Sequence, residues 1–392
     1  MPLALLAGAV ANKPLNGGEA WVRLNWLLGL RRLGFDAYFV ERLEDSAGVD
    51  EEGRPCAPAE SVNRRHLETA MESHGLGDRW ALLDERGESV AGLPAAEIEA
   101  VAAGSEVLFD HSGHLGEGTL LAAPRHRVYV DLDPAYTQVW ADDPSLAFSV
   151  AGYDTYVTVG LNVGDAGCPL PSGGIDWVST PPPVVLEHWP ATPLPAGGPL
   201  RFTTVGTWRS PYGQLPVAGR FAGGKHHEFR RLLSLPERVE GAAFELALDI
   251  HAGDAADLEA LRAAGWAVVP PREVVSTPEA FATYLRGSSA ELSAAQGAYV
   301  ASRCGWFSDR SAAYLASGRP VLVQDTGLGA ALPVGEGLLA FSDLAEAEEG
   351  ARRILADPAG HADAAAELAR AYLDSDLVLG RLLEAIGVAA QP

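Results

Sequence analysis

The stretch SRCGWFSDRSAAYLASGRPVLVQDTG, residues 302–327, carries the strongest fold signal in this sequence. Its first residues read as the end of a strand, and Ser308 and Asp309 then supply side-chain oxygens that can cap the start of a helix. The GRP motif at 318–320 ends that helix, and the apolar run at 321–324 predicts a buried strand. The stretch therefore predicts a strand–helix–strand unit whose helix begins at the carboxyl edge of a parallel sheet.

A helix that begins at such an edge presents free backbone N–H groups and the positive end of its dipole, and both bind anions such as a diphosphate. Arg303 and Arg310 lie beside the helix start and add positive charge. The turn after the next strand returns to the same edge. We therefore expect a phosphate-bearing ligand to be held by residues of this unit, namely Arg303, Ser308, Asp309, Arg310, Asp325 and Thr326.

Strand-like and helix-like segments alternate along the rest of the chain. The strands expected before this unit lie at 3–10, 36–41, 106–110, 127–131 and 154–160. Those expected after residue 200 lie at 201–206, 244–250, 266–269, 298–302 and 320–324, with helices at 255–264 and 311–317. This alternation predicts an α/β protein with two Rossmann-like domains that face each other across a cleft.

A proline-rich interval marks the expected boundary between the two domains. Seven prolines lie within 181–199, where they remove backbone donors and disfavour a helix. Leucines at helical spacing near the end of the chain predict a last helix that packs back on the first domain. The expected organisation is a first domain at 1–185, a linker at 186–199, a second domain at 200–374 and the returning helix at 375–392.

Composition excludes several classes of protein. The 392 residues are 47% apolar and 21% charged, which is typical of a globular chain with two large domains. The formal net charge of −23 repels nucleic acid, so we expect no nucleic-acid partner. No run of about 18 apolar residues predicts an integral membrane segment, and the apolar start lacks signal-peptide features, so we expect a cytoplasmic protein. Three widely spaced cysteines predict free thiols.

The start of the second domain carries two cations. Arg209 follows the first expected strand of that domain, and Lys225 follows a double glycine that introduces a helix. An otherwise acidic protein needs local positive charge to retain a pyrophosphate, so both residues are candidates for binding it. The alternative is that they are two solvated surface cations.

Residues Gly17, Gly18 and Glu19 follow the first expected strand of the chain. Small residues there let a ligand approach the backbone, and the helix start favours an anion or a polar acceptor. A simple turn is the alternative. The full GxGxxG dinucleotide fingerprint is absent, which disfavours a nicotinamide oxidoreductase.

Two further strand ends carry ionisable side chains. Asp110, His111 and His114 follow one strand, and an Asp or His at such a place can act as a general base, although a loop that only caps its neighbours is the alternative. No third metal ligand accompanies these residues. Asp131 begins an Asp-x-Asp motif after the next strand. A strand-end turn is the commoner explanation of that motif. Contact with an acceptor is the next alternative, because Tyr136 and Trp140 could stack on a sugar or aromatic ring, and a metal site ranks below both.

At 308–324 the sequence resembles glycosyltransferases of the two-domain GT-B type, in which a polar loop, a helix, a small-residue turn and a Pro-Val strand follow one another. The resemblance implies a nucleotide-sugar donor held mostly by the second domain, an acceptor held by the first, and no obligatory metal or other cofactor. Arg209 and Lys225 resemble the residues that hold the donor phosphates there. Many retaining members place two glutamates eight residues apart, where this chain has Gly305 and Ala313, so the stereochemistry stays open.

The expected function is transfer of a sugar from a nucleoside diphosphate sugar to a hydroxyl of a small-molecule or glycan acceptor, with the base among Asp110, His111 and His114. Two alternatives remain. The fold also hosts epimerases that act on the sugar nucleotide itself, and the missing glutamate pair is compatible with a catalytically silent binding protein.

Overall fold

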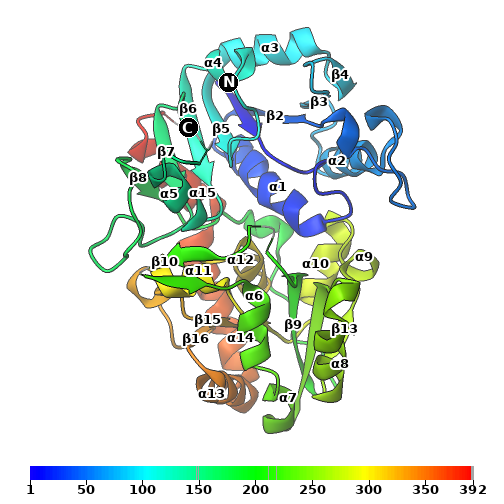
Figure 1. Cartoon of the computed structure of the whole chain (residues 1–392), viewed down its shortest axis with the longest axis vertical. Coiled ribbons are helices and arrows are strands. Elements are labelled where there is room, and N and C mark those ends of the chain that lie inside the picture. Colours follow the sequence, from blue (N-terminus) through cyan, green and yellow to red (C-terminus); the bar gives the residue numbers. More distant parts are fainter. Residues whose placement is uncertain (147, 149, 211, 218, 390–392) are drawn as a thin grey trace.

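The computed structural model describes residues 1–146, 148, 150–210, 212–217 and 219–389, and it contains two α/β halves stacked one above the other (Figure 1). The strand order of the first sheet is β4-β3-β2-β1-β5-β6-β7-β8, and that of the second is β13-β12-β9-β14-β15-β16. Paired strands are parallel within both sheets except for β3 and β4. The predicted fold class is therefore confirmed: two Rossmann-like α/β units make up the chain.

The first sheet is built from short apolar runs buried between layers of helices, as expected for parallel strands. Its strands are β1 (Leu3–Ala7), β2 (Asp36–Arg42), β3 (Trp80–Leu83), β4 (Ser89–Gly92), β5 (Ser105–His111), β6 (His126–Asp131), β7 (Thr155–Thr158) and β8 (Trp177–Ser179). The helices between them are α1 (Gly17–Arg32), α2 (Val62–Glu72), α3 (Ala95–Gly104), α4 (Thr119–Ala122) and α5 (Tyr136–Asp142).

The second sheet repeats this plan. Its strands are β9 (Leu200–Thr207), β12 (Ala242–Asp249), β13 (Ala267–Val269), β14 (Ala290–Ser293), β15 (Val321–Gln324) and β16 (Leu338–Phe341), and a hairpin of β10 (Leu215–Val217) and β11 (Arg220–Ala222) stands apart from it. The helices are α6 (Lys225–Arg231), α7 (Leu235–Arg238), α8 (Ala255–Ala263), α9 (Pro271–Val274), α10 (Pro278–Arg286), α11 (Gly297–Ser302), α12 (Asp309–Ala316), α13 (Leu344–Ala356) and α14 (Pro358–Leu368).

One predicted strand is wrong. Residues 298–302, expected as a strand, form most of helix α11, and the strand of this unit is β14, which lies before it. The reason is Glu291, a fully buried carboxylate in the middle of β14 that interrupts the apolar pattern. Its ion pair with Arg310 of α12 lets a charged residue occupy a central strand.

The chain crosses between the halves twice, at neighbouring places. Val184 pairs with Asp374 in an isolated parallel bridge, and residues 189–199 contain no helix or strand. After the second crossing, α15 (Ser375–Ala385) packs on α1 in the first half, where Arg32 donates two hydrogen bonds to the carboxylate of Asp376, at 2.7 and 2.8 Å. The division into 1–185, 186–199, 200–374 and 375–392 remains our proposal.

The two halves are in direct contact. The Trp21 indole of α1 donates a hydrogen bond of 2.8 Å to the carbonyl of Pro278 in α10. On the other side of the interface, the Asn162 side-chain amide donates to the carbonyls of Arg303 and Gly327, each at 3.0 Å. One apolar core cluster includes buried residues of both halves. The carboxyl edges of the two sheets therefore meet across a packed boundary.

Three further features concern the cysteines, the helices and the clusters of possible metal ligands. Cys56, Cys168 and Cys304 are free thiols, as predicted. Among the described residues, no helix has the length and apolar character needed to span a bilayer. Within the same residues, no group of three or more His, Cys, Asp and Glu side chains is arranged to hold a metal ion.

Candidate functional site

The carboxyl edge of the second sheet brings together the starts of α6 and α12. Gly206 is the second-last residue of β9, and a Cβ atom added to it would lie 3.5 Å from the Lys225 ammonium. Ser308 caps α12 by accepting a hydrogen bond of 3.3 Å from the backbone N–H of Arg310. Lys225 and Ser308, both predicted from the sequence as phosphate contacts, therefore lie at one sheet edge.

Lys225 is the least compensated cation of this edge. Its side chain is half-buried, and among the described residues no carboxylate oxygen lies within the 4.0 Å ion-pair distance of its ammonium. Burial, and then repulsion from Arg310, lower the pKa of Lys225 to about 7. An anion that bound here would relieve both costs, because it would pair with the charge and replace lost solvation.

Arg310 is held differently. Its Nε donates to Glu291 Oε1 at 2.6 Å, one terminal nitrogen donates to the carbonyl of Val205 at 2.6 Å, and the other donates to the hydroxyl of Ser293. The Arg310 side chain is only 11% exposed. These bonds tie the start of α12 to β9 and β14, so Arg310 positions the helix and has few donors left for a ligand.

The remaining predicted contacts of the second half are spread out. Arg209 is ion-paired with Asp254, and Arg303 reaches Asp325 at 3.4 Å. The Asp325 carboxylate also accepts from the N–H of Gly327, and the buried Thr326 hydroxyl donates 2.7 Å to the carbonyl of Trp306. Asp325 and Thr326 thus shape the turn after β15.

Asp309 connects this edge to the first half. It is the first residue of α12 and is half-buried. Burial raises the pKa of Asp309 to about 6, and Arg23 and Glu19 of α1 act on its charge from the opposite half. Beside it, at the ends of β14 and β15, lies a cavity of about 10 Å³ that includes the unpartnered Ser311 hydroxyl in its lining. That volume holds about one water molecule.

The corresponding loop of the first half is filled from within the protein. The carboxylate of Glu41, at the end of β2, accepts hydrogen bonds from the backbone N–H groups of Val10, Ala11 and Asn12 at 2.8, 2.8 and 2.7 Å. Glu41 is buried, and burial raises its pKa while these bonds oppose the rise. An internal carboxylate therefore occupies the place where a ligand anion would bind to this loop.

The two glycines of the first half contact the second half. The N–H of Gly17 donates 2.9 Å to the carbonyl of Val275, and a Cβ at Gly17 would lie 2.0 Å from the carbonyl oxygen of Thr277. A Cβ at Gly18 would meet Phe281 at 2.9 Å. Residues of the second half therefore fill the space beside these glycines, where a ligand had been expected. Glu19 forms an ion pair with Arg23 of the same helix.

The three predicted base candidates differ in accessibility. Asp110 and His111 are fully buried, and the Asp110 carboxylate accepts 2.7 Å from the Tyr153 hydroxyl. Burial raises the pKa of Asp110 to about 6 and holds that of His111 well below its usual range. Part of the His114 ring reaches solvent, although desolvation by its neighbours and then Arg23 lower its pKa to about 4. Only His114 of the three can touch a ligand without movement.

Asp131 is a structural carboxylate. It is fully buried and accepts from the hydroxyls of Thr137 and Thr158 and from the Gln138 amide, at 2.6 to 2.8 Å. Tyr136, expected to stack on an acceptor, is also sealed from solvent. Asp133, two residues further along the chain, is half-buried and accepts hydrogen bonds from Tyr212 and Tyr299 of the second half.

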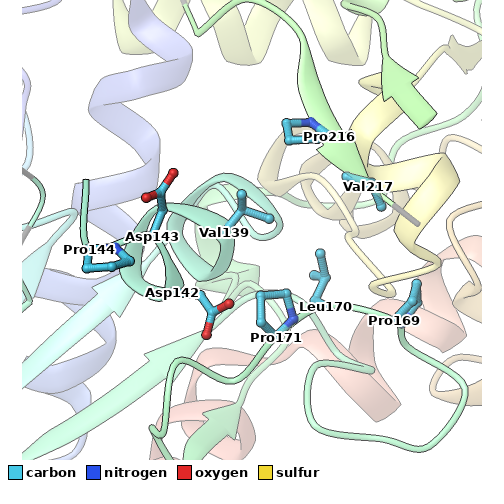
Figure 2. Close-up of a pocket in the computed structure, with 9 residues that line it drawn as sticks. All are labelled: Val139, Asp142, Asp143, Pro144, Pro169, Leu170, Pro171, Pro216 and Val217. Atoms are coloured by element: carbon cyan, nitrogen blue, oxygen red, sulfur yellow. The ribbon is translucent and has the colours of Figure 1, made fainter. Parts of the chain in front are cut away.

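A larger groove lies away from these residues. It has a volume of about 540 Å³ and lies between the end of α5 and the β10–β11 hairpin, with Val139 on one side and Pro216 and Val217 on the other (Figure 2). The loop at 169–171 closes its base (Figure 2). None of the predicted site residues lines it.

Glu41, Asp133 and Asn162 are important residues that sequence reasoning did not assign. Glu41 carried a usable signal, because an acidic residue at the end of the second strand is where dinucleotide-binding proteins hold a ribose. Asp133 is the second aspartate of the Asp-x-Asp motif. It is half-buried, whereas the first aspartate, Asp131, is fully buried. Asn162 gives no signal, because its partners lie more than 140 residues away.

Comparison with known proteins gives no match to a protein-family model and none to a curated protein. Solved structures do match over nearly the whole chain. Anabaena HepE, solved with UDP and glucose, is 11% identical, with 99% of this chain and all of HepE covered at a TM-score of 0.57. Sucrose-phosphate synthase from Thermosynechococcus elongatus is 11% identical, with 99% of each chain covered at a TM-score of 0.56.

A third structure, AviGT4, is a glycosyltransferase involved in avilamycin A biosynthesis. It is 15% identical, with 99% of this chain and 97% of AviGT4 covered at a TM-score of 0.53. At these identities the likeness is one of fold. The two parallel sheets and the full-length matches together show that the chain has the GT-B fold of nucleotide-sugar glycosyltransferases.

Proposed function

We propose that this protein is a glycosyltransferase that moves a sugar from a nucleoside diphosphate sugar to an acceptor hydroxyl, with the donor in the second half and no obligatory metal. The observation that carries the proposal is the contrast between the two sheet edges. The second edge has an ammonium, Lys225, that forms no ion pair among the described residues and lies near the capped start of α12, whereas Glu41 already fills the loop of the first edge.

In this proposal the positive groups of the second half act on the leaving diphosphate. When the bond between the sugar and the diphosphate breaks, negative charge grows on the departing oxygen, and a preorganised cation stabilises that charge. Lys225 and the first N–H groups of α12 supply the positive potential, while Arg310 holds α12 in place through Glu291. Arg209 and Arg303 lie further out, where they contribute to the field.

The proposal is tested by titrating the protein with UDP, the nucleotide bound in the HepE structure. We expect Lys225→Ala to weaken UDP binding about 10- to 100-fold, or roughly 1.4 to 2.8 kcal/mol. Lys13→Ala is the matched control, because Lys13 is the other lysine of the chain and lies exposed in the first half. Calorimetry measures both, and EDTA should leave both unchanged.

The same experiment can contradict the proposal. Equal UDP, GDP, ADP and TDP affinities in the wild type and Lys225→Ala would remove the phosphate assignment, as would binding that requires magnesium. Turnover separates the enzyme classes. An epimerase would change the sugar of the nucleotide without an acceptor, a silent protein would bind without turnover, and a glycosyltransferase would release the nucleoside diphosphate.

A further inference from the structure

Carboxylates at the edge of the first sheet differ sharply in what holds them. Asp110 and Asp131 are fully buried, and partners within the first half hold them. Glu19 is neutralised by Arg23. Asp133 differs from all three because its two described side-chain donors come from the other half of the chain.

Both donors to Asp133 are hydroxyls. Tyr299 of α11 donates 2.9 Å to Oδ1, and Tyr212 donates 3.2 Å to Oδ2. Tyr299 is 2% exposed and fixed in the core cluster between the halves, whereas Tyr212 is 42% exposed in the loop before β10. The first hydroxyl is therefore part of the framework. The second belongs to a partly exposed side chain whose ring rests against Tyr136 and Trp140.

From this geometry we propose that Asp133 receives the hydroxyl of the acceptor, and that Tyr212 holds that place until an acceptor displaces it. The proposal rests on the proposed function. A ligand hydroxyl at Oδ2 would make the same O–H to carboxylate bond that Tyr212 makes now, while Tyr299 keeps the other oxygen in position.

The position of Asp133 relative to the donor supports this assignment. Its negative charge acts on Lys225, the candidate diphosphate contact, from the other half of the chain. His114, the accessible alternative, lies instead with Arg23 and Lys13. Tyr299, which holds Asp133, lies in α11, and Gln296 at the start of that helix accepts a hydrogen bond of 3.2 Å from the backbone N–H of Lys225. One helix therefore ties the candidate acceptor residue to the candidate diphosphate contact.

The chemical step balances as follows. The acceptor oxygen forms a bond to the anomeric carbon, and the bond between that carbon and the diphosphate oxygen breaks. The electron pair of the broken bond stays with the diphosphate, and the proton of the acceptor hydroxyl moves to Asp133 Oδ2. Burial raises the pKa of Asp133 to about 6, which makes it a stronger base than an exposed aspartate and leaves it ionised at pH 7. The pKa of about 4 leaves His114 a weaker base.

The charged and titratable groups that act on Asp133 come from several elements. They are Glu19 of α1, Tyr129 and Asp131 of β6, Tyr136 of α5, Tyr212, Lys225 of α6 and Tyr299 of α11. Of these, the hydrogen bonds from Tyr299 and Tyr212 stabilise the charged form, while Asp131 and Glu19 oppose it.

The first test measures UDP released from UDP-glucose, with water as acceptor, together with UDP affinity. We expect Asp133→Asn to lower kcat at least about 100-fold and to leave the UDP Kd within about twofold. Asp165→Asn is the control, because Asp165 is an exposed carboxylate of the same half. Tyr299→Phe should move the acidic limb of the rate to higher pH, since it removes a bond to the charged form of Asp133.

Two other outcomes would contradict different parts of this account. If UDP binds and Asp133→Asn retains wild-type kcat, the assignment of Asp133 is wrong and the proposed function stands. If no nucleoside diphosphate binds the wild type, the proposed function itself fails, and this assignment fails with it.

A second measurement does not depend on turnover. In the UDP-saturated protein with Tyr212→3-fluorotyrosine, methyl α-glucoside should shift the fluorine resonance, because its hydroxyl displaces the tyrosine. Asp133→Asn in the same protein should remove that shift. A resonance that stays unchanged in the presence of Asp133 would overturn the displacement.

Discussion

In the first half, the loop after β1 gives three backbone N–H groups to Glu41. In the second half, the segment after β9 leads through the β10–β11 hairpin to Lys225, which forms no ion pair within 4.0 Å among the described residues. Both loops lie at the carboxyl edge of a parallel sheet, where ligands bind in such folds. The difference is whether the chain supplies the anion itself. A loop that is already paired contributes to stability, and a loop left unpaired is available to a ligand.

The largest expected effect comes from emptying the first loop. Glu41→Ala should lower the free energy of unfolding by about 3 to 5 kcal/mol, because two buried N–H groups and a part-buried one lose their shared acceptor. Urea denaturation followed by circular dichroism measures the change. The exposed Glu44→Ala should stay within about 0.5 kcal/mol.

The same variant sharpens the comparison between the halves. With Glu41 removed, the first loop becomes an open anion site, so sulfate should stabilise Glu41→Ala more than it stabilises the wild type. A loss below about 1 kcal/mol, with no added response to sulfate, would mean that the Glu41 bonds are not what closes this loop.

The next effect concerns the contact that fills the glycine turn of the first half. Gly17→Ala should lower the free energy of unfolding by about 1 to 3 kcal/mol, because its Cβ would lie 2.0 Å from the Thr277 carbonyl oxygen. Gly380→Ala is the control within α15, where an added Cβ meets nothing within 4 Å, and it should stabilise by about 0.5 to 1 kcal/mol. Thermal unfolding of both variants decides the matter. Stabilisation by Gly17→Ala would show that the halves stand further apart there.

The smallest effect is a pH dependence of the second loop. With a pKa of about 7, Lys225 loses its proton between pH 6 and 8, so UDP affinity should fall as pH rises through this interval, by about tenfold. Binding should also take up protons above pH 7, because the bound diphosphate favours the ammonium. Calorimetry in two buffers of different ionisation enthalpy measures this uptake. Lys225→Ala should lose both responses, and an unchanged slope in that variant would place the titrating group elsewhere.

Local pattern was sufficient for most strands and for the start of α12. Apolar runs at 3–10 and 321–324 predicted strands that the structure contains, and the Ser308 cap predicted the α12 start. The strand β14 was not predicted, because the buried Glu291 interrupts its apolar pattern. Glu291 can be buried there because it forms an ion pair with Arg310, which lies far along the chain. A strand stabilised by a partner from another element is not visible in its own residues.

The site shows the same division. Lys225 could be found because a lysine after a double glycine at a helix start is a local feature. The burial of Asp110 and His111 could not be predicted in this way, because it depends on residues such as Tyr153 and Trp26, which pack over the end of the strand. Side-chain type predicted which residues are ionisable at each edge, while packing decided which of them a ligand can reach.

The hydrogen bonds that Asn162 makes to the second half have a consequence for the exchange of domains between related proteins. Asn162 holds the Arg303 and Gly327 carbonyls, and a Cβ at Gly305 would lie 2.8 Å from its Cγ atom. These segments flank the start of α12, so the first half helps to set where that helix begins. A chimera that joins this second half to a foreign first half should therefore keep an asparagine at this place, because without it the start of α12 loses the contacts that position it.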